Sequence, residues 1–333
     1  MVTVLNWIKS CKICQPLKLR WCILILILIA SFWLFSLSKP SRTLLGAYDP
    51  AKLFQDPSVV LEHHFVTWRP DNASELVAAL QESRTNHRIP MITLEPWAWN
   101  VQGMERSTLL QDILKGRYND TIDRVFRTIK VVTPQQVIFR WAHEMEIVGQ
   151  YPWSVEDSKL YIAAYRYVYQ RSQQLRVNNL IWLWSPAGNK SSINYWPGAD
   201  VVDCVGFSIY ATPEWNPDGS GELPSFKQLM QQKYYLADQW QKPIIVAEVG
   251  VNAGSHKKQL WLSEAIHELS QFPKLIGWVY FNQIQPKIVP LQIGQPDWSL
   301  QPEQVNYLER NWPRLKTKAS IQEELQDLLI HWR

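Results

Sequence analysis

Two glutamates stand where apolar runs typical of buried strands come to an end, and they are the residues of this sequence best suited to act together. Glu144 follows the run Val137–Trp141, and Glu248 ends the run Ile244–Glu248. A carboxylate at the end of a buried strand costs desolvation energy unless it is used or paired. Two such groups on nearby strands can face each other, which is what the hydrolysis of a glycosidic bond requires.

The two carboxyl groups would have different parts in that chemistry. One protonates the leaving oxygen and needs a raised pKa, whereas the other attacks the anomeric carbon and must stay ionised. Water then releases the covalent intermediate, with the first group now acting as base. Arg140 and His143 lie close to Glu144 in the sequence and are candidates to tune either group. The alternative is structural, with Glu144 and Glu248 as salt-bridge partners of Arg140 or of other bases at strand ends.

Other kinds of active site fit the sequence less well. The segment His143–Ile147 is not an H-E-x-x-H zinc motif, because its last position is Ile147. His63 and His64 are adjacent and cannot place both rings on one face of a strand. The sequence has neither a G-x-S-x-G nucleophile elbow nor a P-loop. The two-carboxylate chemistry requires no metal and no organic cofactor, so we expect none.

Short apolar runs alternate with amphipathic stretches around both glutamates, and this pattern predicts the elements that position them. Near-continuous apolar runs are typical of parallel strands that are buried on both faces. Eight strand–helix units over about 270 residues predict a (β/α)8 TIM barrel, whose chemistry lies at the carboxyl ends of its strands. The eight predicted strands are Leu44–Tyr48, His64–Trp68, Pro90–Leu94, Val137–Trp141, Leu180–Trp184, Val201–Ser208, Ile244–Glu248 and Leu275–Phe281.

Helical periodicity fills several of the gaps between these strands. We expect one helix from Ser154 past Tyr169, and a closing helix over Pro302–Asn311. Further helices are expected around Phe226–Trp240 and Leu262–Leu269. An open doubly wound sheet is the alternative fold, but no glycine-rich phosphate turn follows the first strand.

The amino-terminal segment has the features of a membrane anchor. Residues 21–38 form an uncharged run that reaches about 27 Å as a helix, enough to cross most of a bilayer core. Basic residues precede the run, so the amino terminus is expected in the cytoplasm and the remainder in the periplasm or outside the cell. A cleaved signal peptide is the alternative, but bulky residues at the end of the run disfavour it. Cys11 and Cys14 are expected to be reduced thiols in the tail, with no second C-x-x-C to complete a zinc site.

The predicted organisation therefore has five parts. Residues 1–20 form a basic cytoplasmic tail, 21–38 a single-pass transmembrane signal-anchor, and 39–43 a short stalk. Residues 44–312 form the barrel. Residues 313–333 form a carboxyl-terminal amphipathic helix, in which Ser320 and Glu323 match a capping box.

The composition of the 333-residue chain limits the functions that it can have. Hydrophobic residues make up 46%, which is enough to build a large core. Six of the 34 basic residues lie in residues 1–42, which hold no acid, so 28 basic residues face 30 acidic ones elsewhere. This balance argues against a nucleic-acid partner. The 18 tryptophans suit either sugar stacking or core packing.

The sequence around both glutamates resembles glycoside hydrolase family 26, a family of retaining (β/α)8 enzymes that includes β-mannanases. The resemblance extends in order over residues 46–300. The segments that carry it are Thr93–Trp97, Phe139–Met145, Tyr151–Trp153, Trp182–Pro186, Tyr195–Tyr210, Lys242–Gly250 and Asp297–Trp298.

The resemblance implies a role for each matching residue. Glu144 would be the acid/base, Glu248 the nucleophile, and Tyr210 a hydrogen-bond donor to the nucleophile. His143 would line the subsite beside the acid, and Arg140 would hold the carboxylate geometry beneath both glutamates. The remaining substrate-binding or supporting residues would be Glu95 and the ring-bearing residues Trp97, Trp141, Trp153 and either Trp278 or Tyr280.

The resemblance also implies an activity, a retaining endo-β-glycanase with β-1,4-mannan as its default substrate and carboxyl groups about 5–5.5 Å apart. Family members that act on mixed-linkage β-1,3-1,4-glucan or β-1,3-xylan are the alternatives. Two departures bear on the sugar: Glu146 stands where family mannanases often have Asn, and Cys204 where Trp is frequent. A silent polysaccharide-binding protein of an envelope synthesis or export complex is a third reading, and transglycosylation a fourth. The sequence indicates no oligomeric state.

Overall fold

The computed structural model of the chain describes residues 43–69, 73–97, 108–216, 219–287, 294–313 and 321–330. The chain divides into two units, residues 1–41 and 42–333, and the description below concerns the second. The predicted tail, the predicted membrane anchor at 21–38 and nearly all of the predicted stalk lie outside the described residues. Within the described ranges, no helix has both the length and the apolar character that crossing a bilayer requires.

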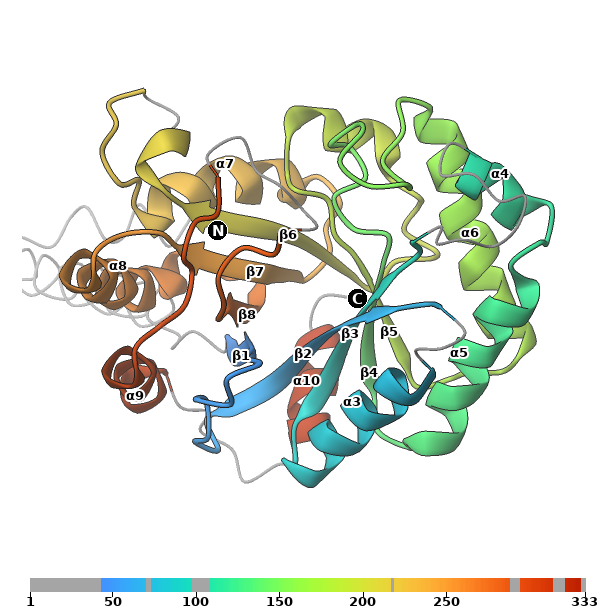
Figure 1. The fold of residues 1–333 in the computed structure, drawn as a ribbon, viewed down its shortest axis with the longest axis horizontal. Helices are drawn as coiled ribbons and strands as arrows, with labels where there is room; N and C mark the ends of the chain where they lie inside the picture. The colour runs from blue at the N-terminus through green and yellow to red at the C-terminus, as the bar shows by residue number, and fades with distance from the viewer. Residues whose placement is uncertain are drawn as a thin grey trace, which may run out of the picture. The chain divides into compact units, whose positions relative to one another are not determined.

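Eight parallel strands form a closed barrel in sequence order, with β8 hydrogen-bonded to β1 (Figure 1). This arrangement confirms the predicted TIM barrel, and four of the strands have the predicted bounds. The strands are β1 (Leu44–Tyr48), β2 (Val59–Thr67), β3 (Ile89–Glu95), β4 (Val137–Trp141), β5 (Leu180–Trp184), β6 (Cys204–Ala211), β7 (Ile244–Val251) and β8 (Leu275–Phe281).

Helices surround the strands on the outside of the barrel (Figure 1). The longer ones are α3 (Ala73–Thr85), α5 (Asn119–Val132), α6 (Ser158–Gln174), α7 (Phe226–Asp238), α8 (Ser255–Glu268) and α9 (Pro302–Asn311). Shorter elements are α4 (Leu109–Leu114) and the 3-10 turns η4 (Lys190–Tyr195), η5 (Pro213–Trp215) and η6 (Leu269–Gln271).

The start of α6 differs from the predicted one because a different residue caps it. The Asp157 side chain accepts a hydrogen bond from the backbone N–H of Leu160, which stabilises the first turn of the helix. Ser154 was the expected start, but its hydroxyl donates to the carbonyl oxygen of Tyr151 and accepts from the N–H of the same residue. Ser154 therefore closes a tight turn before the helix.

Side chains alternate between the inside and the outside of the barrel along each strand, as the period of two requires. The inner cluster near the amino ends of the strands includes Met91, Ile138 and Leu183. The opposite set, including Phe139 and Trp182, packs with the helices in the larger outer core. The barrel interior is therefore a packed core and leaves room for chemistry only near its carboxyl end.

The carboxyl-terminal helix α10 (Ile321–Ile330) covers the amino end of the barrel. Its buried residues Leu325, Leu328 and Leu329 belong to the same apolar cluster as the inward-facing residues of the strands. These three leucines lie on one face of the helix, as the spacing i, i+3, i+4 requires. The predicted amphipathic helix thus closes the end of the barrel that does not hold the candidate site.

A β-bulge near the carboxyl end of β7 interrupts the alternation. Phe207 of β6 pairs with Val246, but the next residue, Ser208, pairs with Glu248, so β7 holds one extra residue at Ala247. The pairing of β7 with β8 shifts between Val246 and Val249 as well. A bulge re-aims the side chain that follows it. Strict alternation from the inward Ala247 would have turned Glu248 toward the helices, and the bulge brings it into the barrel mouth.

Candidate active site

A cavity of about 610 Å³ opens at the carboxyl ends of the strands. This volume is within the range of cavities that bind small molecules or a few sugar rings. Glu95, Glu144 and Glu248 all line it, together with the aromatic residues Tyr48, Phe65, Trp97, Tyr151, Tyr210, Trp215 and Phe281. The remaining described lining residues are His143, Ile147, Gln150, Ala187, Asn189, Ser208, Leu229, Gln232, Lys233, Gln283, Gln285 and Pro286.

Glu248 is buried and held by two donors of different charge. The Nη1 atom of Arg140 lies 2.6 Å from Glu248 Oε1, and the Tyr210 hydroxyl donates to Oε2 at 2.5 Å. The contact with the guanidinium is a charge-assisted hydrogen bond. Burial and the charge of Glu248 raise the pKa of Tyr210 well above its usual range, so that hydroxyl keeps its proton and donates.

Glu144 is held in an unusual backbone conformation. Its φ angle is +52° and that of Ala142 is +47°, in the left-handed region that side-chain-bearing residues seldom adopt. The backbone N–H of Glu144 donates to the carbonyl oxygen of Ser185 at 2.9 Å, which ties the strained segment to the end of β5. Lys52, His87, Arg176 and Gln241 also have positive φ angles, but of the six residues Glu144 alone lines the cavity.

The carboxyl group of Glu144 is positioned by hydroxyl groups and carries a raised pKa. Ser208 Oγ donates to Oε1 at 2.5 Å, and the Tyr151 hydroxyl lies 3.3 Å from Oε2. Burial, followed by the charge of Glu248, raises the pKa of Glu144 to about 7. The two glutamates therefore differ in the way that acid and nucleophile must differ, since Glu144 is favoured in its protonated form and Glu248 has a cationic partner.

Glu95 is a third carboxyl group on the cavity wall. Its Oε2 accepts a hydrogen bond from Trp97 Nε1 at 3.0 Å. Burial raises the pKa of Glu95 to about 7, against the lowering effect of that hydrogen bond. Glu95, predicted as a supporting residue, therefore lies inside the site. Glu95 and Glu144 take up protons over the same pH range, because the pKa of each is raised to about 7.

A polar layer lies directly beneath the two glutamates. Arg140 is fully buried, and its Nη1 also lies 3.4 Å from Thr93 Oγ1, which in turn is 2.7 Å from His63 Nε2. His143 lines the cavity beside Glu144. Burial, followed by the charge of Arg140, lowers the pKa of both His63 and His143 well below the usual range, so both rings are neutral. Arg140 is therefore the cation of this layer.

The structure corrects the stacking role expected for Trp141, Trp278 and Tyr280. All three rings are completely buried, and none of them lines the cavity. Trp141 packs against α6, Trp278 lies 5.2 Å from the ring of Trp312, and the Tyr280 hydroxyl donates to the carbonyl oxygen of Trp298. Successive side chains of a strand point to opposite sides of the sheet, and these three residues are at positions that face the helices.

Trp153 is also not open to a substrate. Its ring is fully buried and stacks on that of Tyr151 with 4.7 Å between centroids, and its Nε1 donates to the carbonyl oxygen of His143. Trp153 therefore supports the wall behind Tyr151. Of the tryptophans expected to stack on sugar, Trp97 alone lines the cavity.

Several lining residues escaped the sequence interpretation. Phe281, and not Trp278 or Tyr280, is the aromatic residue that β8 contributes to the cavity. Phe281 lies two residues after the inward-facing Val279, so alternation along the strand predicts that it also faces inward. Trp215 lies in η5 with 36% of its surface exposed, so it offers a ring face at the rim. Ser208 lies within a segment that carries the family resemblance but had no role assigned to it, and Lys233 lies outside all of those segments.

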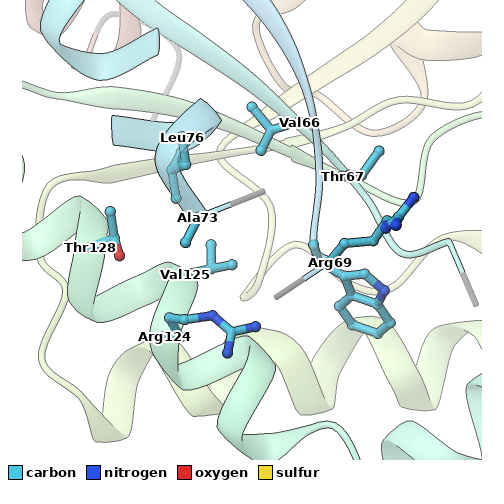
Figure 2. A pocket seen from close by; sticks show the side chains of 9 residues that line it. Val66, Thr67, Arg69, Ala73, Leu76, Arg124, Val125 and Thr128 are labelled. Carbon is cyan, nitrogen blue, oxygen red and sulfur yellow. The ribbon is translucent and has the colours of Figure 1, made fainter. Parts of the chain in front are cut away.

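Figure 2 shows a second, much smaller pocket on the outside of the barrel, where the end of β2 meets α3 and α5. Val66, Leu76 and Val125 supply most of its apolar wall, and Arg124 lies at its edge. Its volume of about 10 Å³ is close to the space that one water molecule needs. This pocket is too small for a sugar.

A TIM barrel with glutamates following β4 and in β7 that line one cavity has the architecture of a glycoside hydrolase. Comparison with known proteins identifies the family. The sequence model of Glycosyl hydrolase family 26 matches residues 97–277, more than half of the chain. The chain therefore belongs to glycosyl hydrolase family 26, as its motifs predicted.

Three curated relatives share 25–28% identity with parts of this chain. Endoglucanase H of Acetivibrio thermocellus is 25% identical over 261 residues, covering 74% of this chain and 27% of the relative. A β-1,3-xylanase of Alcaligenes sp. is 28% identical over 218 residues, covering 59% and 45%. A mannan endo-1,4-β-mannosidase of Bacillus subtilis is 28% identical over 159 residues, covering 44% and 39%. The chain thus spans less than half the length of each of these relatives.

Solved structures of the family share the fold. A family 26 β-mannanase from Bacteroides ovatus superimposes with a TM-score of 0.60 at 14% identity, covering 85% of this chain and 93% of that one. A modular endo-β-1,4-mannanase from Cellulomonas fimi gives a TM-score of 0.56 at 13% identity, covering 86% and 70%. At such identities the likeness concerns the architecture alone.

Proposed function

We propose that this chain is a retaining endo-β-glycanase in which Glu144 is the acid/base and Glu248 the nucleophile. The observation that carries the proposal is the unequal setting of two carboxyl groups on one cavity wall. Burial and a like charge raise the pKa of Glu144 to about 7, whereas Glu248 lies 2.6 Å from the buried guanidinium of Arg140. A protonated acid facing an ionised carboxylate is what double displacement at a sugar needs.

The reaction follows from these settings. Glu144 gives its proton to the glycosidic oxygen while a carboxylate oxygen of Glu248 attacks the anomeric carbon, so the leaving sugar departs with a new hydroxyl group. The ionised Glu144 then takes a proton from water, whose oxygen attacks the same carbon and releases Glu248. Tyr210 stays hydrogen-bonded to Glu248 and orients the attacking oxygen.

The proposed substrate is a β-linked polysaccharide, with β-1,4-mannan as the first candidate. The mannan endo-1,4-β-mannosidase among the curated relatives supports mannan, whereas the endoglucanase and the β-1,3-xylanase support the two alternatives. The cavity supplies Trp97, Trp215 and Phe281 as apolar faces for sugar rings. We further propose that residues 21–38 anchor the enzyme in a membrane, with the barrel in the periplasm or outside the cell.

Digestion of a panel of polysaccharides tests the proposal. The full chain would be incubated with mannan, mixed-linkage β-glucan, cellulose, β-1,4-xylan and β-1,3-xylan, and the new reducing ends would be measured. We expect one polymer to be cut internally, and proton NMR of the first product to show the β-anomer. Release of the α-anomer would contradict the retaining mechanism. Binding of a polymer without any cleavage would favour the silent polysaccharide-binding protein, and longer products would favour transglycosylation.

A further inference from the structure

Glu146 is a buried charge that the proposed chemistry does not use. It lies two residues after the acid and does not line the cavity. Its Oε1 accepts hydrogen bonds from the backbone N–H groups of Gly188 and Asn189, at 3.0 and 3.3 Å, and from Ser192 Oγ at 2.8 Å. A carboxylate that accepts backbone N–H groups makes strong, charge-assisted bonds. Glu146 therefore holds one side of the segment that follows β5.

Lys233 of α7 holds the other side of the same segment. Its Nζ donates to the carbonyl oxygen of Ala187 at 2.7 Å and also to that of Ser208. Gly188 has a φ angle of +92°, and a Cβ atom added there would lie 3.0 Å from Cδ of Lys233. Glycine thus lets the backbone lie directly on the lysine stem. The buried Glu146 and the half-buried Lys233, of opposite charge, thus hold residues 187–189 from two sides as a clamp.

These contacts connect the clamp to the acid and to the cavity. Ala187 and Asn189 both line the cavity, so the clamped segment is part of its wall. Ser208, whose carbonyl oxygen binds Lys233, donates from its hydroxyl to Glu144. The acid gives its proton to the oxygen of the leaving sugar, so the wall next to the acid borders the leaving group.

We propose that Glu146 and Lys233 are paired positioning residues that fix the wall of the leaving-group subsite, and thereby the choice of sugar on that side. This inference rests on the proposed function. Glu146 does not line the cavity and acts through the segment 187–189, whereas Lys233 holds the same segment and also lines the cavity beside it. A displacement of about 1 Å in a wall that orients a substrate can cost up to roughly a hundredfold in rate.

Two substrates separate a positioning role from general damage. One is the natural polymer, which fills both sides of the site. The other is a β-oligosaccharide with a dinitrophenyl leaving group, which has sugars only on the glycone side and needs little help from the acid. We expect Glu146→Ala, a change outside the cavity lining, to raise KM for the polymer by roughly tenfold and to leave kcat/KM for the aryl substrate within about twofold. Lys233→Met should raise KM for the polymer by a similar factor. Glu146→Gln keeps an acceptor oxygen and should recover most of the loss.

Glu309 provides a matched control. It is a buried glutamate whose Oε1 also accepts two backbone N–H groups, those of Gln55 at 2.8 Å and Asp56 at 2.9 Å, but it does not line the cavity. Glu309→Ala should lower stability without changing KM for the polymer. If Glu146→Ala fails to fold, Gly188→Ala tests the same point, because it keeps both charges and displaces the segment.

The outcomes distinguish the two proposals. Equal losses on both substrates in Glu146→Ala would overturn the clamp while leaving the proposed function intact. So would an unchanged KM for the polymer in Glu146→Ala, Lys233→Met and Gly188→Ala alike. A wild-type chain that cleaves neither substrate would overturn both.

Discussion

The two ends of this barrel are built from the same eight strands and have opposite characters. At the carboxyl end, three glutamates face one cavity, and one of them has a left-handed backbone. At the amino end, inward-facing residues such as Ile138 and Leu183 form an apolar cluster with the leucines of α10. Burial of apolar side chains at the amino end stabilises the fold. This stabilisation offsets the free energy that holding charged groups close together costs at the carboxyl end. Function and stability are thus separated along each strand.

The largest expected effect is at Glu248, the proposed nucleophile. Glu248→Gln should reduce kcat by roughly 10⁴-fold or more, because the amide cannot form the glycosyl-enzyme. Steady-state kinetics on the polymer would measure the loss, and circular dichroism would check that the fold persists. Glu248→Ala should also abolish hydrolysis, and it should cost about 3 kcal/mol in stability, because Arg140 keeps a buried charge without its partner. An active variant of either kind would refute the assignment.

The acid should show a dependence on the leaving group. Glu144→Ala should slow cleavage of the polymer by about 10²- to 10⁴-fold, but should slow dinitrophenyl glycosides much less in the first step, because these leave without protonation. Pre-steady-state kinetics would separate this first step from the breakdown of the intermediate. Equal losses for good and poor leaving groups would show that Glu144 is not the acid.

The apolar end should respond in stability alone. Leu325→Ala should lower the free energy of unfolding by about 2–4 kcal/mol, since it leaves a cavity beneath the barrel. Denaturant unfolding would measure the loss, and kcat per folded molecule should stay unchanged. Ile330, 62% exposed on the same helix, is the control, and Ile330→Ala should cost less than about 0.5 kcal/mol. A change in kcat for Leu325→Ala would show that the two ends are coupled.

The folded protein should become more stable when the buried carboxyl group of Glu144 can no longer ionise. The pKa of Glu144 is raised to about 7 in the folded state, so the folded state binds more protons than the unfolded state between about pH 4.5 and 7. Stability is therefore lost as the pH rises through this window. Glu144→Gln removes that loss and should gain about 1–2 kcal/mol at pH 7.5 and nothing at pH 4. Thermal unfolding at both pH values would measure the gain, and equal gains would contradict it.

The smallest expected effect concerns the hydroxyl group beside the acid. Ser208 donates to Glu144 and favours its ionised form, so Ser208→Ala should raise the pKa of the acid. The alkaline limb of the kcat/KM profile should move upward by less than about one pH unit, and Ser208→Thr should restore it. A limb that shifts in Glu95→Gln but not in Ser208→Ala would assign that limb to Glu95 instead.

Most of the barrel could be predicted from the sequence, and the errors have local causes. β1, β4, β5 and β8 are uninterrupted apolar runs, and their predicted bounds are the observed ones. β2 was expected to begin at His64 but begins at Val59, because Glu62 interrupts the apolar pattern. That carboxylate is paired inside the fold with Arg88 and Asn86, a compensation that the sequence does not reveal.

The candidate site was predictable in its acids and less so in its aromatic residues. Both glutamates follow recognisable strands, and the family motifs name them. The bulge at Ala247 has no sequence signature, yet it decides that Glu248 faces the cavity. Trp141 and Tyr280 lie near the ends of strands, as the residues that line the cavity do. Their positions in the alternation of each strand point their side chains toward the helices instead. Predictions at a barrel mouth therefore need the register of each strand as well as its bounds.

The backbone of Glu144 bears on what the fold and the reaction each require at this position. A glycine at this position would relax the φ angle of +52° and remove a like charge beside Glu248. Replacement by glycine would thus relax the backbone, whereas most other side chains would keep its strain. The fold itself therefore does not demand a glutamate at position 144, and the demand for one comes from the reaction.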